Sequence, residues 1–466
     1  MAQGLFDLAW VAQACGGAIV GDPARRFDRF VKDSREDVRD ALYVALRGER
    51  FDGHAFLGAV AAAGASAALV EADRFRPEDL GALPAVVVPD VVRALAEVAR
   101  AHRRRMSARV LGLTGSCGKT TTKELLAAVL RNVGPTLATA GNLNNQIGVP
   151  FTLLGLRPEH RFAVVELGCN HPGEIAGLAA IAEPEVGLIT CVAAAHLEGL
   201  GSLDGVARAK GELFAALDRP DATAVVNLDD ERVAGIPTGR ARRIGVGPGP
   251  GADVRLGLPA TGQGDGALSV SFPDGRRARA TLALPGRHIL LDAGLAAAAA
   301  WVVGATVEAI EAGLSGVGAA RHRGEILTSS RGVVVLDDTY NANPGSMGAA
   351  IAALDDVPGT GRKVAILGEM LELGEATGTL HREVGAAAGR SGLGLLVCVG
   401  PSAGRMAEGA RAAGPGEVVV FEAVEPLLGE LDRLVRTGDR VLVKGSRGMR
   451  MERVVEGILR GSDDAV

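Results

Sequence analysis

A glycine-rich stretch between an extended run and a helical run constrains this chain most. The letters GLTGSCGKTTT occupy 112–122, follow the apolar run that begins with Val110, and lead into apolar positions that share one helical face. The expected order is therefore strand, glycine loop, helix. Such a loop exposes backbone N–H groups at a helix N-terminus, where the helix dipole favours an anion. The stretch predicts a phosphate-binding loop, although a glycine-rich turn with a chance lysine would have similar letters.

The residues of this loop have separate expected roles. Lys119 would reach the β- and γ-phosphates of a nucleotide, and the Thr120 hydroxyl would hold Mg²⁺. Gly115, Gly118 and Thr121 complete the predicted nucleotide-binding set. The strict phosphate-loop pattern has glycine where this chain has Leu113, so only the shorter core 115–120 is intact.

The alternation of apolar and helical runs predicts an α/β chain, and its 466 residues are enough for about three domains. We expect a small N-terminal α/β domain at 1–105. A central phosphate-loop domain with a mainly parallel sheet should occupy 106–320, and a Rossmann-like, doubly wound C-terminal domain 321–466. Residues 268–284 predict a hairpin added to the central sheet, whereas the Gly- and Pro-rich stretch 245–266 predicts a loop.

Charge and cysteine content argue against several classes of protein. The formal net charge of −5 disfavours a general nucleic-acid binder, and the basic run 102–105 is expected to be a solvated helix end. Five widely spaced cysteines fit neither a disulfide framework nor a zinc site. One of them, Cys117, is expected to be only a small tolerated residue in the loop. With no visible signal peptide and no apolar stretch of bilayer length, we expect a cytoplasmic protein.

Three further residues are candidates for chemistry beside the phosphate loop. Glu166 ends an apolar run, so its carboxylate is placed to bind Mg²⁺ at the carboxyl edge of the sheet. His196 follows the next apolar run and could help to hold a second Mg²⁺, although a lone histidine is more often structural. Lys210 lies on the following helix, where spacing does not separate a functional lysine from a solvated one.

Polar loops elsewhere are candidate substrate sites. The amides of Asn142, Asn145 and Gln146 could bind substrate or form Asx-type turns, and both alternatives stay open. In the C-terminal part, the polar loops 336–347, 367–374 and 443–452 each follow a strand candidate. Ligand sites in open α/β sheets lie at strand carboxyl ends, so these loops together predict a binding face.

Taken together, these strings resemble the Mur ligases, the ATP-dependent amide-forming enzymes of peptidoglycan precursor synthesis. The resemblance covers nearly the whole chain through DSR…DGH, TGSCGKTTTKE, GNLNNQIGVP, ELGCNHPGEI, AHLEGLGSLDGVARAKGE, LPGRH, DDTYNANPGSM, LGEMLELG and VKGSRGMRME. It is strongest to the member that joins D-alanyl-D-alanine to UDP-N-acetylmuramoyl-tripeptide. The resemblance implies ATP and Mg²⁺ as cofactors, with the uridine nucleotide in the first domain, ATP in the second and the dipeptide in the third.

The resemblance also implies roles for individual residues. It assigns Lys119, Lys210 and His196 to catalysis, and Lys210 would be carbamylated and bind metal together with Thr120, Glu166 and His196. It assigns the nucleotide contacts beyond the loop to Arg323, Asp338 and Asn341. The residues implied for the substrates are Ser34, Arg35, His54, Asn142, Asn145, Gln146, Asn343, Lys444 and Arg447.

The chain departs from the family pattern at two places. His322 stands where glycine is usual, and Ile289 and Asp292 stand where the family usually has asparagines, which puts the adenine contacts in question. Two alternatives are therefore kept: a sibling or folylpolyglutamate synthetase-like ligase that adds a single amino acid, and a non-catalytic nucleotide-binding subunit. A monomer is expected.

Overall fold

The computed structural model describes residues 4–48, 51–259, 266–414 and 416–460. The chain divides into two compact units. Unit 1 comprises Met1–Gly112, Pro135–Leu167 and Ala176–Pro184, and unit 2 comprises Leu113–Gly134, Gly168–Ile175 and Glu185–Val466. Among the helices of the described residues, none combines the length and the apolar character needed to cross a bilayer.

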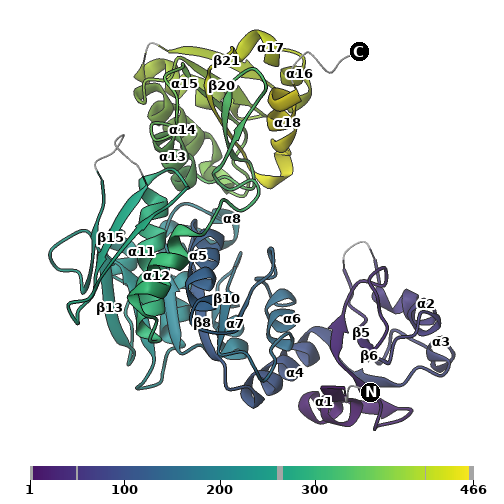
Figure 1. Ribbon diagram of the computed structural model, residues 1–466. Helices are drawn as coiled ribbons and strands as arrows, with labels where there is room; N and C mark the ends of the chain where they lie inside the picture. Colours follow the sequence, from purple (N-terminus) through teal and green to yellow (C-terminus); the bar gives the residue numbers. More distant parts are fainter. Residues whose placement is uncertain (1–3, 49–50, 260–265, 415, 461–466) are drawn as a thin grey trace. The chain divides into compact units, whose positions relative to one another are not determined.

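The N-terminal part of unit 1 is built on a five-stranded sheet with the order β2-β7-β6-β5-β4. Only the β2–β7 pair is antiparallel. The strands are β2 (Ala18–Val20), β4 (Arg29–Val31), β5 (Ala41–Val44), β6 (Ala67–Glu71) and β7 (Ala85–Val88), and a separate pair joins β1 (Phe6–Asp7) to β3 (Arg26–Phe27). Every residue of β5 is buried, as expected for a parallel strand covered on both faces. Around the sheet are α1 (Leu8–Cys15), η1 (Gly53–Phe56), α2 (Leu57–Ala62) and α3 (Pro77–Leu80), several of them labelled in Figure 1.

The last turn of α4 (Val91–Arg105) corrects the prediction of a solvated helix end. His102 is fully buried, and its Nε2 lies 3.0 Å from the Leu156 carbonyl oxygen. Arg103 is also buried and donates to the Ala182 carbonyl oxygen, whereas Arg104 is exposed and pairs with Glu183. Burial lowers the pKa of His102 to about 4, so its ring is neutral. The prediction was wrong because the buried face of α4 extends to the end of the helix and includes His102 and Arg103.

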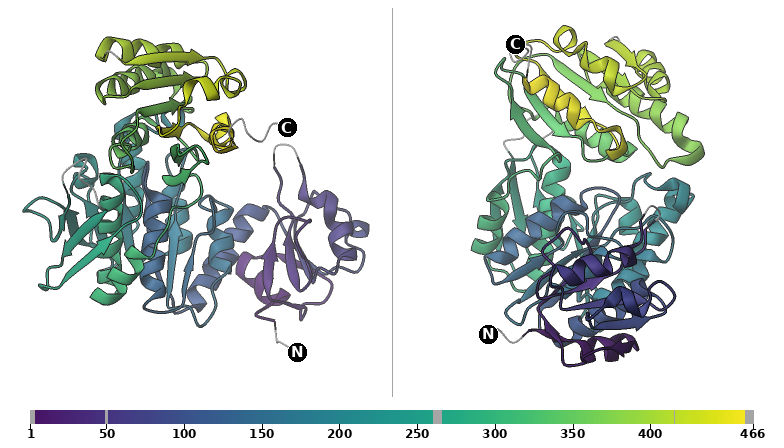
Figure 2. Two further views of the ribbon diagram at one scale, coloured as in Figure 1. Left: turned by 45° about the horizontal axis from the view of Figure 1, so that its top comes forward. Right: turned by 90° about the vertical axis from the view of Figure 1, so that its right-hand side faces the viewer.

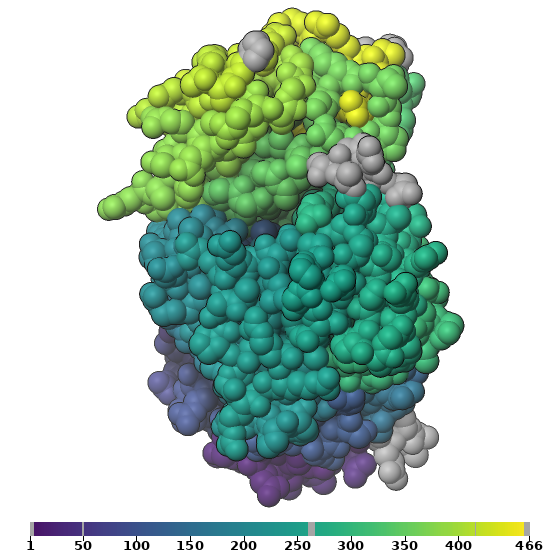
Figure 3. Space-filling view, turned by 90° about the vertical axis from the view of Figure 1, so that its left-hand side faces the viewer, coloured from purple at the N-terminus to yellow at the C-terminus, as the bar shows by residue number. Residues whose placement is uncertain are grey.

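Two parallel strands, β9 (Thr136–Ala138) and β10 (Phe162–Glu166), complete unit 1, with α6 (Gly148–Leu154) between them along the chain. In unit 2 the strands β16-β15-β14-β13-β12-β11 are neighbours in that order. They are β11 (Val186–Ile189), β12 (Thr223–Asn227), β13 (Arg242–Gly247), β14 (Val254–Gly257), β15 (Ala267–Ser271) and β16 (Arg277–Thr281). Pairs from β11 to β14 are parallel, and β15 and β16 form the predicted antiparallel hairpin. Figure 3 shows this region from outside as the teal part of the surface.

The prediction of a loop at 245–266 was wrong where the segment contributes to two strands. Gly245 to Gly247 belong to β13, and β14 occupies 254–257 with Val254 and Leu256 buried. The Asp253 carboxylate accepts a hydrogen bond from the Gly245 N–H at 2.7 Å, which ties the two strands together. Gly and Pro composition concealed this short alternating strand, and the part of the predicted loop at 260–265 lies outside the described residues.

Three helices of unit 2 pack side by side (Figure 1): α5 (Lys119–Arg131), α11 (Arg287–Val302) and α12 (Val307–Ser315). A Cβ at Gly313 would collide with the backbone of Val129, so glycine permits α12 to approach α5 closely. The other helices of this region are α8 (Leu197–Leu200), α9 (Leu203–Ala215) and α10 (Glu231–Ala234), and α7 (Glu174–Ala182) runs from unit 2 into unit 1.

The C-terminal sheet of unit 2 has the order β17-β18-β22-β19-β20-β21, and only the β17–β18 pair is antiparallel. The strands are β17 (Glu325–Thr328), β18 (Val334–Asp338), β19 (Lys363–Leu367), β20 (Leu395–Val399), β21 (Glu417–Phe421) and β22 (Arg440–Lys444). One buried cluster joins it to α13 (Pro344–Ala353), α14 (Thr377–Arg390) and α15 (Ala403–Ala413). A second cluster lies under α16 (Val424–Leu428), α17 (Leu431–Leu434) and α18 (Glu452–Arg460). Figure 2 shows the ribbon of this sheet with helices on both of its faces. This confirms the predicted doubly wound sheet, although the edge strand β17 was not predicted.

Helices α14 and α15 touch through glycines, which leads to a stability prediction. A Cβ at Gly385 would collide with the Met406 carbonyl oxygen, so Gly385→Ala should lower the free energy of unfolding by about 1–3 kcal/mol. Gly378 lies on the same helix with open space around it, and Gly378→Ala should instead be neutral or stabilise by about 0.5–1 kcal/mol. Urea denaturation of both variants would check this, and equal effects would contradict the close-packing argument.

Candidate active site

The phosphate-loop stretch has the predicted order of strand, loop and helix. The strand β8 (Arg109–Thr114) ends at the loop, and α5 begins at Lys119. Gly118 caps the helix in the left-handed conformation with φ 80°, which a residue with a side chain adopts at a cost in strain. The Lys119 ammonium folds back over the loop and donates to the Gly115 carbonyl oxygen at 2.7 Å. Thr120 is buried in the first turn of the helix.

The segment 190–193, which follows β11, holds the back of the loop. The Thr190 N–H donates to the Thr114 carbonyl oxygen at 2.9 Å, and the Ser116 N–H donates to the Cys191 carbonyl oxygen at 2.9 Å. The Ala193 N–H donates to Ser116 Oγ at 2.9 Å. A Cβ at Gly115 would collide with Thr190 Oγ1, so this contact needs glycine. The loop is therefore fixed by the protein itself from the side opposite its helix.

Two residues outside the loop, Cys191 and Asp292, contact it, and the sequence did not predict either contact. Cys117 Sγ lies 2.9 Å from Cys191 Sγ, a contact between residues 74 positions apart. Asp292 on α11 lies against Gly118, where an added Cβ would come within 2.5 Å of the carboxylate. Burial raises the pKa of Asp292 well above its usual range.

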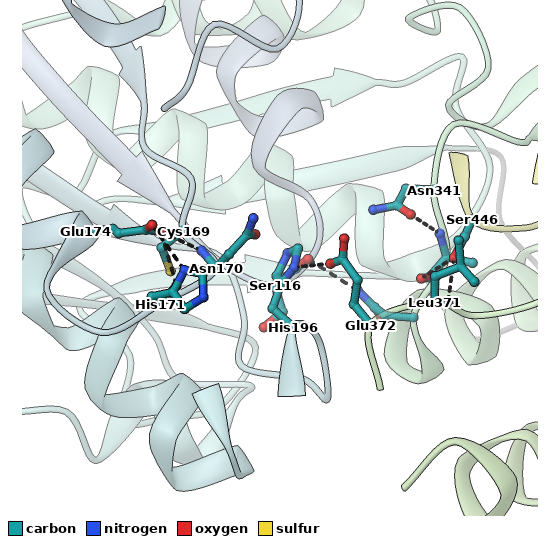
Figure 4. A network of polar contacts seen from close by, with 12 residues as sticks. Ser116, Cys169, Asn170, His171, Glu174, His196, Asn341, Leu371, Glu372 and Ser446 are labelled. Atoms are coloured by element: carbon teal, nitrogen blue, oxygen red, sulfur yellow. Dashed lines mark hydrogen bonds and ion pairs between the residues drawn. The ribbon is translucent and has the colours of Figure 1, made fainter. Parts of the chain in front are cut away.

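His196 pairs with a residue of the C-terminal part of unit 2. Its Nδ1 lies 2.5 Å from Glu372 Oε2, and the Glu198 N–H donates to the Glu372 carbonyl oxygen at 3.3 Å. Figure 4 shows His196 and Glu372 facing each other. Burial lowers the pKa of His196, while the Glu372 carboxylate acts in the opposite direction.

The two opposing effects on His196 make a prediction for its titration. In Glu372→Gln the negative charge is lost and burial remains, so the pKa of His196 should fall further below its value in the unchanged protein. An NMR titration of the His196 ring, assigned from the spectrum of His196→Gln, would measure this. Glu198→Gln removes a nearby charge that has no recorded side-chain contact with His196 and is the matched control. A higher pKa in Glu372→Gln would contradict this account of the pair.

Lys210 is buried on α9, so it is not a solvated helix lysine. Its Nζ lies 3.0 Å from Cys169 Sγ, and Cys169 is buried as well. The next residues form a polar turn, because Glu174 accepts hydrogen bonds from the N–H groups of Asn170 and His171 at 2.7 and 3.1 Å. Figure 4 shows this turn.

The three predicted C-terminal loops contact one another. Lys444 Nζ lies 2.6 Å from Asp338 Oδ2 and donates to the Asn341 carbonyl oxygen at 2.8 Å. Ser446 Oγ accepts a hydrogen bond from the Leu371 N–H at 2.9 Å, which joins the third loop to the second. The three loops therefore form one cluster, and its role as a binding face stays a prediction.

The first of these loops also touches the phosphate loop. Asn343 caps α13 and donates through Nδ2 to the Ser116 carbonyl oxygen at 3.3 Å. The Arg323 guanidinium lies 3.7 Å from the centre of the Tyr340 ring, and Arg447 lies 5.9 Å from it on the same ring. His322, one of the departures from the family pattern, has φ 64° and places Nδ1 2.7 Å from the Asp337 carboxylate. The contact of the imidazole with Asp337 thus accompanies a left-handed backbone conformation at a position where glycine is usual in the family.

Thr121 lies on α5, and the other predicted residues lie in unit 1. The Glu166 carboxylate is buried and accepts a hydrogen bond from Asn144 Nδ2 at 2.8 Å. Asn145 Oδ1 accepts the N–H groups of Ile147 and Gly148, which is the turn geometry weighed as an alternative. Asn142 and Gln146 are exposed.

The residues predicted for the uridine nucleotide have different environments. Arg35 is exposed and forms an ion pair with Asp33, and Ser34 is half-buried beside it. His54 is buried, with Nδ1 2.6 Å from Asp52 and Nε2 accepting the Glu71 N–H at 2.9 Å. Both ring nitrogens of His54 are thus engaged within unit 1, and its contact with substrate stays a prediction.

Comparison with known proteins confirms the resemblance stated from the motifs. The Mur ligase middle domain matches residues 113–300, and the Mur ligase glutamate ligase domain matches residues 322–447. A curated protein of Escherichia coli (strain K12), UDP-N-acetylmuramoyl-tripeptide--D-alanyl-D-alanine ligase, is 40% identical over 437 residues and covers 92% of this chain and 93% of its own length. The chain belongs to the Mur ligase family.

Solved structures of Mur ligases support the fold along the whole chain. A crystal structure of MurF from Acinetobacter baumannii has a TM-score of 0.88 with 32% identity and covers 99% of this Mur ligase and 100% of that chain. A MurF ligase from Thermotoga maritima in complex with ADP has a TM-score of 0.78 with 29% identity, over 93% and 97% of the two chains. The predicted α/β fold class is thereby confirmed.

Proposed function

We propose that this Mur ligase joins D-alanyl-D-alanine to UDP-N-acetylmuramoyl-tripeptide with hydrolysis of ATP to ADP and phosphate, which completes the pentapeptide precursor of peptidoglycan. The contact that carries the proposal is the hydrogen bond from Asn343 to the Ser116 carbonyl oxygen, because it brings the C-terminal loop cluster to the phosphate loop. The name of the 40% identical Escherichia coli relative supports this substrate pair over a single amino acid. A requirement for ATP favours action in the cytoplasm.

The reaction proceeds in two steps. The terminal carboxylate of the tripeptide attacks the γ-phosphorus of ATP, ADP leaves, and an acyl phosphate forms. The amine of D-alanyl-D-alanine then attacks the acyl carbon, phosphate leaves, and the amine loses a proton. The start of α5 and the Lys119 ammonium stabilise charge on the phosphoryl oxygens. Gly115 and Gly118 in the loop and Thr121 in the first turn of α5 would contact the same phosphates, and Arg323, Asp338 and Asn341 would supply the remaining nucleotide contacts.

Thr120, Glu166 and His196 are proposed as the residues that would hold Mg²⁺, as the family resemblance implies. A buried hydroxyl at a helix start and a buried carboxylate at a strand end are oxygen donors of the kind that this ion prefers. The described residues hold no group of three or more His, Cys, Asp or Glu that could bind a metal by themselves, and Mg²⁺ commonly completes its shell with phosphate oxygens and water. When bound, the ion would withdraw charge from the transferred phosphoryl group.

Lys210 is proposed to be carbamylated. A buried ammonium is costly unless it is paired, and carbamylation by carbon dioxide converts it to an anion that can bind a cation. Its only recorded partner in the described residues is the Cys169 thiol.

The substrates are proposed to divide among three domains at 1–105, 106–320 and 321–466. The matched ranges 113–300 and 322–447 support the second and third of these. Ser34, Arg35 and His54 would bind the uridine nucleotide in the first domain. Asn142, Asn145 and Gln146 would contact the tripeptide, and Asn343, Lys444 and Arg447 the dipeptide. We propose that the enzyme acts as a monomer.

Phosphate release tests this function. Phosphate should form when UDP-N-acetylmuramoyl-tripeptide, ATP and D-alanyl-D-alanine are all present, and omission of any one should reduce it to background. The ligated pentapeptide should appear in equal amount by mass spectrometry. Release with a single amino acid in place of the dipeptide would indicate a sibling ligase. ATP binding without phosphate release in the complete mixture would indicate a non-catalytic subunit.

A further inference from the structure

Two free cysteines meet at the back of the phosphate loop. Cys117 belongs to the loop itself, and Cys191 belongs to the segment that holds it. Their sulfur atoms are 2.9 Å apart, and Cys191 Sγ lies 3.5 Å from the Cys117 carbonyl oxygen. Both residues are half-buried. In the described residues this is the one recorded contact between two cysteine sulfurs.

The backbone holds the two cysteines in register on both sides of the contact. The residue before each cysteine is engaged, since Thr190 donates to Thr114 and Ser116 donates to the Cys191 carbonyl oxygen, both at 2.9 Å. The Thr190 hydroxyl also donates to the Cys117 carbonyl oxygen. Because these hydrogen bonds fix the partners, the usual entropy cost of bringing two thiols together has been met by folding. From this geometry we propose that Cys117 and Cys191 form a reversible disulfide that switches off the phosphate loop.

Cys191 is more readily oxidised than Cys15 and Cys398, because its pKa is lowered whereas theirs are raised. The hydrogen bond from Cys117 lowers the pKa of Cys191 to about 7, with a smaller contribution from Lys119 and opposition from burial and Asp230. In the same pair the pKa of Cys117 is raised, so one sulfur carries the proton and the other is the thiolate. By contrast, burial raises the pKa of Cys398 to about 12 and also raises that of Cys15. The thiolate is the reactive form of cysteine, so Cys191 is the expected point of attack.

Hydrogen peroxide is a suitable oxidant, and the reaction with it balances. The Cys191 thiolate attacks one peroxide oxygen, the O–O bond breaks, and the products are a sulfenic acid and hydroxide, which takes up a proton to become water. Cys117 then attacks the Cys191 sulfur, the S–O bond breaks, and a second water leaves with the thiol proton. Two thiols have lost two electrons to the peroxide. A dithiol reductant reverses the change through a mixed disulfide.

The bond would displace the phosphate-binding backbone. An S–S bond is about 2.0 Å long, so Cys117 or Cys191 must move by roughly 1 Å from the present contact. Cys117 lies between Ser116, which is hydrogen-bonded on both its N–H and its Oγ, and Gly118, which begins the cap of α5. Misplacement of phosphate-binding groups by about 1 Å costs on the order of 10²-fold in rate. The oxidised enzyme should therefore lose at least about 10²-fold of its activity.

Treatment of the full chain with a small excess of hydrogen peroxide tests the switch. The expected product is 2 Da lighter, contains a cross-linked peptide pair that joins Cys117 to Cys191, and regains its free thiols with dithiothreitol. Phosphate release should fall and recover in parallel. Only this last readout rests on the proposed function, so a cross-link without any ligase activity in the reduced enzyme would count against the function and not against the disulfide.

Matched variants distinguish inactivation by the Cys117–Cys191 disulfide from inactivation by oxidation at other residues. Cys191→Ser should keep its activity in peroxide, whereas Cys15→Ser should lose activity as the unchanged protein does, because Cys15 is a half-buried thiol far along the chain from the loop. Should Cys191→Ser fail to fold, the cross-linked peptide and the mass of the unchanged protein still decide. Added oxygen on Cys117 or Cys191 without a cross-link, or equal inactivation of Cys191→Ser, would overturn the proposal.

Discussion

Lys119→Ala should lower phosphate release by about 10²–10³-fold while the protein stays folded. The Lys119 ammonium is a cation at the start of α5 and donates to the Gly115 carbonyl oxygen of its own loop. Removing it takes away positive charge where the phosphoryl oxygens would lie. The loss should fall mainly on kcat, because the charge on these oxygens is redistributed as the reaction proceeds. Initial rates at saturating substrates, with circular dichroism for the fold, would measure it.

Lys363→Ala is the matched control for the loss of a lysine. Lys363 begins β19, at the end of the strand away from the predicted binding face, and it pairs with Asp355 at 2.7 Å. Its removal should leave the rate within about twofold, since it lies outside the loops that hold the substrates. Turnover near that of the unchanged enzyme in Lys119→Ala would remove the assignment of the phosphate loop.

The second large effect is expected on stability, at the ion pair between Asp338 and Lys444. Lys444 is only 3% exposed, and its ammonium lies 2.6 Å from the Asp338 carboxylate. Asp338→Ala would leave a buried ammonium with only carbonyl partners, and breaking a buried pair in this way costs about 3–5 kcal/mol. We expect a value near the lower end, about 3 kcal/mol, because Asp338 is 23% exposed and because two backbone carbonyl oxygens still face the ammonium. The urea midpoint of the C-terminal part, followed by hydrogen exchange in β18 and β22, would report it.

The reverse change separates charge from packing. Lys444→Met keeps most of the volume and leaves the partly exposed Asp338 carboxylate, which water can solvate, so it should cost less than Asp338→Ala. The double variant should regain part of the loss seen in Asp338→Ala, because no buried charge remains. If Asp338→Ala and Lys444→Met destabilised equally, the buried ammonium would not be the source of the effect.

The sequence predicted those elements whose structure depends on residues close together in the chain. The order of β8, loop and α5 could be predicted because a short stretch of sequence contains all the signals. These are the glycines at 115 and 118 and the apolar positions on one face of the helix. The hairpin of β15 and β16 was predictable for the same reason, since Asp274 and Gly275 mark its turn. The family resemblance rested on such short strings, and the comparisons confirmed it.

Packing between distant segments decided what the sequence did not predict. Strand β14 is stabilised by its neighbours β13 and β15 despite a Gly- and Pro-rich surrounding. His102 and Arg103 are buried because residues 54 and 79 positions away accept their hydrogen bonds. The meeting of Cys117 with Cys191 and of Asp292 with Gly118 depends on the packing of the phosphate loop against the segment after β11 and against α11. None of these contacts produces a pattern of residue spacing from which it could be predicted.

The hydrogen bonds from 190–193 to the back of the phosphate loop have a thermodynamic consequence for the free enzyme. A loop that must become ordered around its ligand loses conformational entropy at that moment, and affinity falls accordingly. Here Thr190, Cys191 and Ala193 restrain the loop in the ligand-free chain. Nucleotide binding should therefore carry a small entropic penalty from this loop, and loosening it, for example by Thr190→Gly, should weaken affinity without removing any group that touches a phosphate.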